Sequence, residues 1–405
     1  MDRMIDRRTL LAATGALGVG VLGLNSVAIG CARTPGAPAA PEAGLTPALR
    51  EDFEASAREL QTPGAVMLLR TPSGEFSAAY GSRTDTGSEP VTLADHVRIG
   101  SITKTFTGTV ILQLAQEGHL DIDAPVSEYR TDVPNGRNIT LRQLLSMRSG
   151  LYNYSESLEF NQALDSDPTK VWTTDELLDL GFKYPPYFPP GTEFHYSNTN
   201  TVLLGLIAEQ VDRRPLGLAF QTRFFTPLAM RETAFPDVSS SAIATPHPRG
   251  YMYGTNVSTM NSEALPLDQQ AAARAGTLKP HDVTDWSPSW TWAAGGAIST
   301  AADLATWATA LADGTLLNPT WQRRRLDSIR PTNPSSPSAA GYGLGIAMFG
   351  PMYGHTGELP GFQSFAAVDP DRKRTLVVWA NLNAAPDGRA PASTIAQKLI
   401  GKLYA

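Results

Sequence analysis

Residues 97–108 read VRIGSITKTFTG, and the interpretation of the whole chain starts from this stretch. It places Ser101 three residues before Lys104 and directly after Gly100. Residues three apart lie on one face of a helix, so the lysine amine would stand beside the serine hydroxyl. A serine hydroxyl becomes a useful nucleophile when a neighbouring base takes its proton. A buried lysine can have its pKa lowered far enough to be that base.

The surrounding run SITKTFTGTVILQLAQEGHL, residues 101–120, predicts a helix with an apolar face. Ser101 would then lie at the helix N-terminus, which favours the negative charge that develops during attack on a carbonyl. The Ser-x-x-Lys spacing occurs by chance in many chains, so it needs support from other segments.

A second polar segment is Tyr196-Ser197-Asn198, within PPGTEFHYSNTNTVLLG. A tyrosine oxygen can relay a proton, and an asparagine amide can hold a substrate carbonyl. The structural alternative is a tyrosine packed at the start of a helix, with Ser197 or Asn198 as its cap.

The third segment is His355-Thr356-Gly357, within PMYGHTGELPGF and just before a predicted strand. A glycine there lets a ligand approach the backbone at the edge of a strand. Taken alone, the histidine would be interpreted as an ordinary loop residue.

In this order, the three segments are similar to the Ser-x-x-Lys, Tyr-x-Asn and Lys/His-Thr-Gly motifs of the penicillin-recognising serine hydrolases. The stretches ITLRQLLSMRSGLYNY, WAAGGAISTAADLATW and YGLGIAMFGPMYGHTGELPGF also resemble that family. The resemblance runs from about Leu45 to Ala405. It is closest to the exocellular D-alanyl-D-alanine carboxypeptidase branch, which has histidine in the third motif and shares its fold with class C β-lactamases and certain esterases.

The resemblance implies an acyl-enzyme mechanism. Ser101 would attack a carbonyl carbon, and Lys104 and Tyr196 would shuttle protons. The backbone N–H groups of Ser101 and Glu358 would form the oxyanion hole, so the side chain at 358 need not disturb it. The substrate-binding residues implied in the same way are Asn198, Trp290, His355, Thr356, Gly357 and Glu358.

The chain departs from the carboxypeptidase branch at two pocket positions. The threonine that follows the third motif is replaced by Glu358, and the expected arginine after YGLGI is Ala347. That arginine helps bind the substrate's C-terminal carboxylate. Losing a charge-assisted contact costs about 1.5–3 kcal/mol, so recognition falls about tenfold or more. We therefore expect esters, or amides without a free carboxylate, to suit the pocket better than D-Ala-D-Ala peptides.

Several functions remain open within and beyond this chemistry. As a serine hydrolase, the protein would be a D-alanyl-D-alanine carboxypeptidase or penicillin-binding enzyme, an esterase or a β-lactamase. The non-enzymatic alternatives are a binding protein for cell-wall peptides or β-lactams, and a structural lipoprotein. Intact Ser101, Lys104 and Tyr196 favour catalysis, because a pure binder does not need a base. No cofactor or metal is predicted, because the six histidines are scattered and no phosphate-binding glycine loop occurs.

The pattern of predicted elements points to an α/β (α+β) fold. A helix over residues 46–61 precedes two short apolar runs around a Pro/Gly turn, the middle is mostly helical, and the chain ends in two strands and a helix. We therefore predict a β-lactamase/transpeptidase-like domain over residues 45–405. An antiparallel sheet flanked by helices would take residues of about 45–120 and 290–405, and an all-helical insertion about 121–289.

The first 32 residues are predicted to be an export signal. A basic start is followed by an uncharged run from Thr9 to Gly30, and Arg7-Arg8 resembles a twin-arginine signal. Ala28-Ile29-Gly30-Cys31 resembles a lipobox, whose cysteine is lipidated. Cleavage after Ala32 and a membrane-spanning helix are the alternatives.

Residues 33–44 are rich in proline and alanine and predict a spacer. We expect an exported protein at the outer face of the cytoplasmic membrane, held by a lipid on Cys31, or a periplasmic or secreted one. The substrate would be a small molecule or a peptidoglycan peptide. The net charge is −6 and no basic tract follows the N-terminal region, so a nucleic-acid partner is not expected. The sequence leaves the oligomeric state open.

Overall fold

The structure is a computed structural model that describes residues 45–336 and 340–405. The predicted export signal, Cys31 and the spacer lie outside these residues. Within the described ranges, no helix has the length and apolar character needed to cross a membrane.

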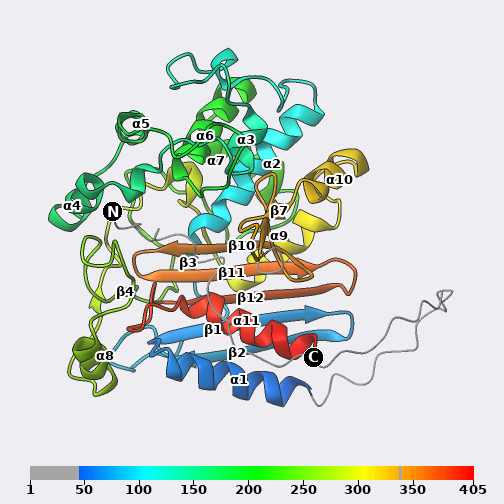
Figure 1. Cartoon of the computed structure of the whole chain (residues 1–405). Coiled ribbons are helices and arrows are strands. Elements are labelled where there is room, and N and C mark those ends of the chain that lie inside the picture. The colour runs from blue at the N-terminus through cyan, green and yellow to red at the C-terminus, as the bar shows by residue number, and fades with distance from the viewer. Residues whose placement is uncertain (1–44, 337–339) are drawn as a thin grey trace, which may run out of the picture.

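An antiparallel sheet of eight strands forms the centre of the molecule, in the order β2-β1-β12-β11-β10-β9-β8-β7 (Figure 1). The two ends of the chain meet in it, because Ala65 of β1 pairs with Ala380 of β12. The strands are β1 (Gly64–Thr71), β2 (Gly74–Gly81), β7 (Arg330–Pro331), β8 (Gly341–Tyr342), β9 (Ala347–Phe349), β10 (Met352–Leu359), β11 (Phe362–Asp369) and β12 (Arg374–Ala380).

Two short strand pairs lie outside this sheet, and both are antiparallel. One of them joins the segment before Ser101 to the segment before helix α9. Their strands are β3 (Val97–Arg98) with β6 (Ile298–Ser299), and β4 (Tyr251–Met252) with β5 (His281–Asp282).

Helices cover both faces of the sheet. In Figure 1, α1 (Leu45–Glu59) and α11 (Pro391–Leu403) cross the face toward the viewer, and they share a buried apolar cluster with the strands beneath them. Helix α9 (Ala301–Ala312) packs against β1, β11 and β12. The remaining helices are α2 (Thr103–Gln116), α3 (Leu141–Leu145), α4 (Leu158–Ser166), α5 (Thr174–Lys183), α6 (Asn198–Asp212), α7 (Leu216–Phe220), α8 (Leu267–Arg274) and α10 (Pro319–Asp327).

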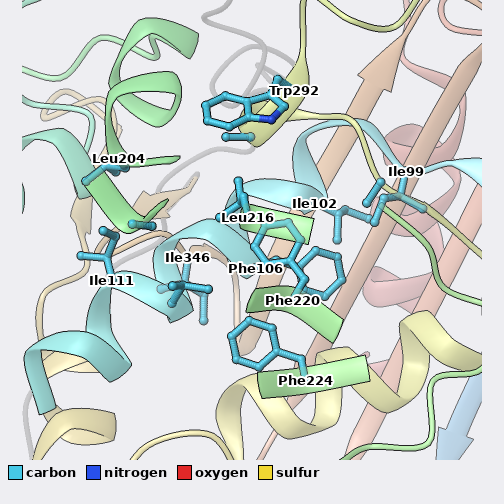
Figure 2. Close-up of a cluster of buried hydrophobic side chains, with 14 of the residues drawn as sticks. Ile99, Ile102, Phe106, Ile111, Leu204, Leu216, Phe220, Phe224, Trp292 and Ile346 are labelled. Atoms are coloured by element: carbon cyan, nitrogen blue, oxygen red, sulfur yellow. The ribbon is translucent and has the colours of Figure 1, made fainter. Parts of the chain in front are cut away.

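A second, larger core surrounds α2, next to the β10 side of the sheet (Figure 2). Phe106 lies at its centre, with the ring of Trp307 at 4.3 Å and the ring of Phe225 at 5.2 Å between centroids. Twelve residues of α2 are buried, so this helix is enclosed by protein on almost every side. Such packing fixes the position of the helix that carries the Ser-x-x-Lys segment.

The predicted elements are largely confirmed. The first helix, both hairpins, the helical middle and the closing helix all occur. Two details differ from the prediction. Ser101 lies in a 3₁₀ turn, Gly100–Ile102, that leads into α2. His355 lies inside strand β10 rather than in a loop before a strand, because Gly354, His355 and Thr356 pair with β11. The division into sheet and helical domains stays a prediction.

Candidate active site

The Ser-x-x-Lys segment forms the contact that its spacing predicts. Lys104 Nζ donates a hydrogen bond to Ser101 Oγ over 2.9 Å. The turn that holds Ser101 continues directly into α2, so both side chains project from one face at the start of the helix. A proton can pass between a hydroxyl and an amine at this separation.

Lys104 is buried, with only 2% of its surface exposed, and it has contacts on several sides. Its Nζ also donates to the carbonyl of Ala294 over 2.8 Å. It also lies 4.8 Å from the centroid of the Tyr196 ring, within the range of a cation–π contact. The first and second predicted motifs therefore meet around one buried amine.

The approach of β10 to Ser101 depends on two glycines. A Cβ on Gly100, whose φ is +51°, would lie 2.6 Å from the backbone nitrogen of Glu358. A Cβ on Gly357 would collide with the carbonyl of Ile99. Strand β9 pairs only with residues 352–354 of β10. Beyond these residues, the Gly100 turn packs against β10. The amides of Ser101 and Glu358, the predicted oxyanion donors, therefore belong to two segments in direct contact.

His355 brings the third motif to the same place, with its ring centroid 6.1 Å from that of Tyr196. Its Nδ1 lies 2.5 Å from the carbonyl of Thr356, so Nδ1 carries the proton and donates it. Its Nε2 then accepts from the Tyr342 hydroxyl over 3.1 Å. Burial, which the hydrogen bond to Thr356 opposes and the nearby Lys104 reinforces, lowers the pKa of His355 to about 3, so the ring is neutral at physiological pH.

A hydrogen-bonded chain that the sequence analysis missed holds Asn198. Its Nδ2 donates to Ser155 Oγ over 2.9 Å, and its backbone N–H donates to Asn153 Oδ1 over 3.0 Å. Ser155 Oγ donates to the same Asn153 oxygen. Asn153 Nδ2 donates to Glu156 over 2.7 Å, and Glu156 in turn contacts His195, the residue before Tyr196. The only signal of this chain in the sequence is the polar run NYSES, residues 153–157, after GLY at 150–152.

A cavity of about 230 Å³ lies in front of these groups. Trp290 is on its wall, where its carbonyl accepts from Tyr154 and its ring meets Phe160 edge-on at 5.5 Å. Gly357 is not on the wall, because it packs against Ile99 instead. The predicted residues that line the cavity are Ser101, Tyr196, Asn198, Trp290, His355, Thr356 and Glu358.

The charged residues on the cavity wall are carboxylates. Glu263 and Glu358 line it, and among the described residues around it there is no lysine or arginine. Ala347, at the position where an arginine was expected, also lines the cavity and pairs with Gly354 of β10. Within residues 45–336 and 340–405, no group of three or more potential metal ligands occurs.

Comparison with known proteins identifies the family. The sequence profile described as Beta-lactamase matches residues 49–399, nearly all of the described chain. The chain belongs to this family. Its members are serine hydrolases, and the predicted family, fold class and enzyme class are thereby confirmed.

Solved structures of the family extend this assignment. A D-stereospecific amidohydrolase from Streptomyces sp. is 32% identical, with a TM-score of 0.73, and the match covers 89% of this chain and 98% of that one. A D-amino acid amidase from Ochrobactrum anthropi SV3 is 25% identical, with a TM-score of 0.75 and the same two coverages. A penicillin binding protein from Bacillus halodurans, 22% identical with a TM-score of 0.69 and coverage of 87% and 100%, shares the fold.

A curated family member, protein flp of Staphylococcus aureus (strain COL), is 27% identical over 340 residues, which are 80% of this chain and 60% of flp. The chain therefore spans about 60% of the length of that relative. A substrate that is a small molecule or a peptide is consistent with the family.

Proposed function

We propose that the protein hydrolyses amides of D-amino acids that carry no free carboxylate, through an acyl-enzyme on Ser101. The observation that carries this proposal is the charge of the cavity wall, where Glu263 and Glu358 are present and no lysine or arginine lies among the described residues. A substrate carboxylate would have no cation to bind and two carboxylates nearby. The likeness to the D-stereospecific amidohydrolase, at 32% identity, supports an amide of a D-amino acid.

The contacts of Lys104 support a two-step reaction. Ser101 Oγ attacks the substrate carbonyl carbon while its proton passes to Lys104, 2.9 Å away, with Tyr196 beside the same amine. The C–N bond then breaks, and the leaving nitrogen takes a proton, which frees ammonia or an amine. Water adds to the resulting ester, and the D-amino acid leaves as Ser101 regains its proton. Backbone amides of Ser101 and Glu358 would stabilise the negatively charged oxygen in both steps.

Helix α11 supports the same choice of substrate. Gln363 of β11 and Ser393 of α11 exchange two hydrogen bonds of 2.9 Å, and Gln397 of α11 also faces the cavity. These side chains are polar but uncharged. The helix therefore does not supply a cation in place of the arginine that Ala347 lacks.

Steady-state kinetics on three substrates would test the proposal. We expect kcat/KM for D-phenylalanine amide to exceed that for L-phenylalanine amide and that for a peptide ending in D-Ala-D-Ala. A higher kcat/KM on the D-Ala-D-Ala peptide would overturn it in favour of a carboxypeptidase. The mass of protein trapped with a fluorophosphonate, a serine-reactive reagent without a carboxylate, mapped to Ser101 and absent from Ser101→Ala, would test Ser101 as the nucleophile independently.

We also propose that the protein works outside the cytoplasm, held at the membrane by a lipid on Cys31. The support is the sequence alone: the twin-arginine resemblance, the lipobox resemblance and the Pro/Ala-rich spacer. Fractionation of cells that express the full chain should find it with membranes, and Cys31→Ala should release it or leave it unprocessed. Equal membrane association of the two forms would contradict the lipid anchor.

A further inference from the structure

We propose that Arg325 is a positioning residue of the active site, which acts through the Tyr342 hydroxyl to hold the His355 ring in one orientation and one tautomer. Arg325 does not line the cavity. Its effect would be the same for any acyl substrate, so the proposal rests on the acyl-enzyme at Ser101 and not on which acyl group is accepted.

Arg325 is a buried cation without a counter-ion. It lies on α10, none of its surface is exposed, and it forms no ion pair within residues 45–336 and 340–405. Its Nη2 donates to Thr109 Oγ1 over 2.8 Å, but Nε and Nη1 have no hydrogen-bond partner among the described residues. Burial lowers its pKa to about 9, so the guanidinium is still charged at neutral pH. Burying a charge without an opposite charge is costly, so packing alone does not explain this arginine.

The end of α10 places Arg325 against strand β8. The carbonyl of Arg325 accepts from Ser328 Oγ over 2.6 Å, and the same Oγ accepts from the backbone N–H of Leu344 over 2.9 Å. Arg330, just after the helix, pairs with Tyr342 in the sheet. The charge of Arg325 reaches the phenol there, because burial raises the pKa of Tyr342 well above its ordinary value and Arg325 opposes that rise.

A cation on this side of Tyr342 decides which way its hydroxyl points. The oxygen is the negative end of the O–H dipole, so it is drawn toward the guanidinium, and the hydrogen is directed to His355 Nε2 at 3.1 Å. Nε2 is thereby held as an acceptor, and Nδ1 keeps the proton that it donates to the Thr356 carbonyl. If the hydroxyl turned round, its oxygen would accept from a protonated Nε2 and would stabilise an imidazolium.

A charged His355 would interfere with the chemistry of the site. The titratable side chains that face His355 or share its strand are Lys104 of α2, Tyr196 before α6, Tyr342 of β8, and Tyr353 and Glu358 of β10. An imidazolium would add a positive charge beside the amine that takes the Ser101 proton, and this would slow the attack on the substrate. By keeping the hydroxyl a donor, Arg325 keeps this ring neutral.

The experiment compares Arg325→Met with Arg325→Lys on the full chain, labelled with ¹⁵N-histidine. In the wild type, NMR should show His355 neutral with its proton on Nδ1 between pH 5 and pH 8. Arg325→Met, which removes the charge, should raise the proton affinity of His355 about 100-fold, and Arg325→Lys should retain most of the wild-type behaviour. His355→Gln assigns the signal. Arg323→Met is a matched control, because Arg323 is an exposed arginine of the same helix.

The rate at which a fluorophosphonate labels Ser101 gives a second readout. From pH 7 to pH 5, this rate should fall about twofold or more further in Arg325→Met than in the wild type, because His355 takes up a proton in that range. Tyr342→Phe should abolish the difference, since phenylalanine has no oxygen to accept from an imidazolium. Urea unfolding should find Arg325→Met no less stable than the wild type, because an unpaired buried charge has been removed.

An unchanged titration of His355 in Arg325→Met overturns the proposal. An equal change in Arg325→Met and Arg325→Lys also overturns it, because the charge would then not be the cause. So does a change that persists in the Tyr342→Phe background, because Arg325 would then act by another route. None of these readouts needs an aminoacyl amide, so a failure of amide hydrolysis leaves the test intact. Wild-type Ser101 that resists the fluorophosphonate would instead contradict the acyl-enzyme.

Discussion

The cavity has two walls of different character. The wall formed by the Ser101 turn and the start of α6 is supported by polar groups that are bonded to one another: Lys104, behind this wall, bonds to Ser101 and Ala294, and Asn198 bonds to Ser155. The wall built from β10, β11 and α11 carries Glu358, Gln363 and Gln397, and no lysine or arginine among its described residues. The first wall fits the mechanism shared by the family, and the second departs from its carboxypeptidase branch. Chemistry and specificity are therefore carried by separate elements.

The largest effect should come from the wall that carries Ser101. Lys104→Met keeps the length of the side chain and removes the amine that contacts Ser101. We expect kcat/KM for every acyl substrate to fall about 10³-fold or more, because the serine loses its base. The rate of acylation by a chromogenic ester, measured by stopped flow, tests this loss. Lys398→Met is the control, since Lys398 pairs with Asp52 on the surface. Near-normal acylation by Lys104→Met would assign the base to another residue.

The second-largest loss of kcat/KM should come from disturbing the contact between the Gly100 turn and Glu358. Gly100→Ala forces a Cβ against the Glu358 nitrogen and should separate the two oxyanion donors, which lowers kcat/KM about 10²–10³-fold. Gly118→Ala is a matched control. Gly118 also has a positive φ, of +80°, but open space around its Cβ position. Gly118→Ala has the backbone strain without the clash, so it should lose less stability than Gly100→Ala in urea unfolding and keep its activity. Equal activity of the two would contradict the proposed oxyanion hole.

The third prediction concerns the charge of His355, because a protonated ring would give the β10 wall a positive charge. Its pKa is about 3 in the folded protein and 6.5 ordinarily, so the unfolded chain takes up a proton at a higher pH than the native state does. Native stability is then fully present above pH 6.5 and falls as the pH drops toward 3. From pH 7 to pH 5 this one group should cost about 2 kcal/mol.

Urea unfolding of the wild type and of His355→Gln at both pH values measures this cost. The loss of stability on acidification should be about 2 kcal/mol smaller in the variant. Identical pH dependence of the two proteins would mean that His355 has its ordinary pKa in the native state, and the wall would then carry a cation at pH 5.

The smallest effect concerns the support of Asn198. Ser155→Ala removes the acceptor of the Asn198 amide and should raise KM more than it lowers kcat, with kcat/KM falling about fivefold to tenfold. Ser166→Ala is a control, because Ser166 is an exposed serine of α4 that bonds only to its own helix among the contacts described. An unchanged kcat/KM in Ser155→Ala would show that this chain of hydrogen bonds does not orient the substrate.

The two walls also differ in how far the sequence predicts them. Ser101 and Lys104 are three residues apart, so local helix geometry alone predicts their contact. Packing of β10 beside the segment before α6 brings His355 to Tyr196, and only the resemblance to the family predicted that meeting. The bonds of Asn153 and Ser155 to Asn198 join loops far apart in the sequence, and polar side chains at such positions have many alternative partners. For the same reason, the sequence did not predict that Glu263 and the residues of α11 lie at the cavity.

The pairing of Ala65 with Ala380 has a consequence for how the enzyme folds during its synthesis. Strands β1 and β12 cannot join until the chain through Ala380 has left the ribosome. Contacts between such distant segments form slowly, because a long loop must close before they contribute stability. Strand β10, whose Glu358 amide completes the proposed oxyanion hole, is synthesised long after Ser101 and Lys104. A nascent chain therefore carries Ser101 and Lys104 without an assembled active site until strands β10, β11 and β12 have left the ribosome.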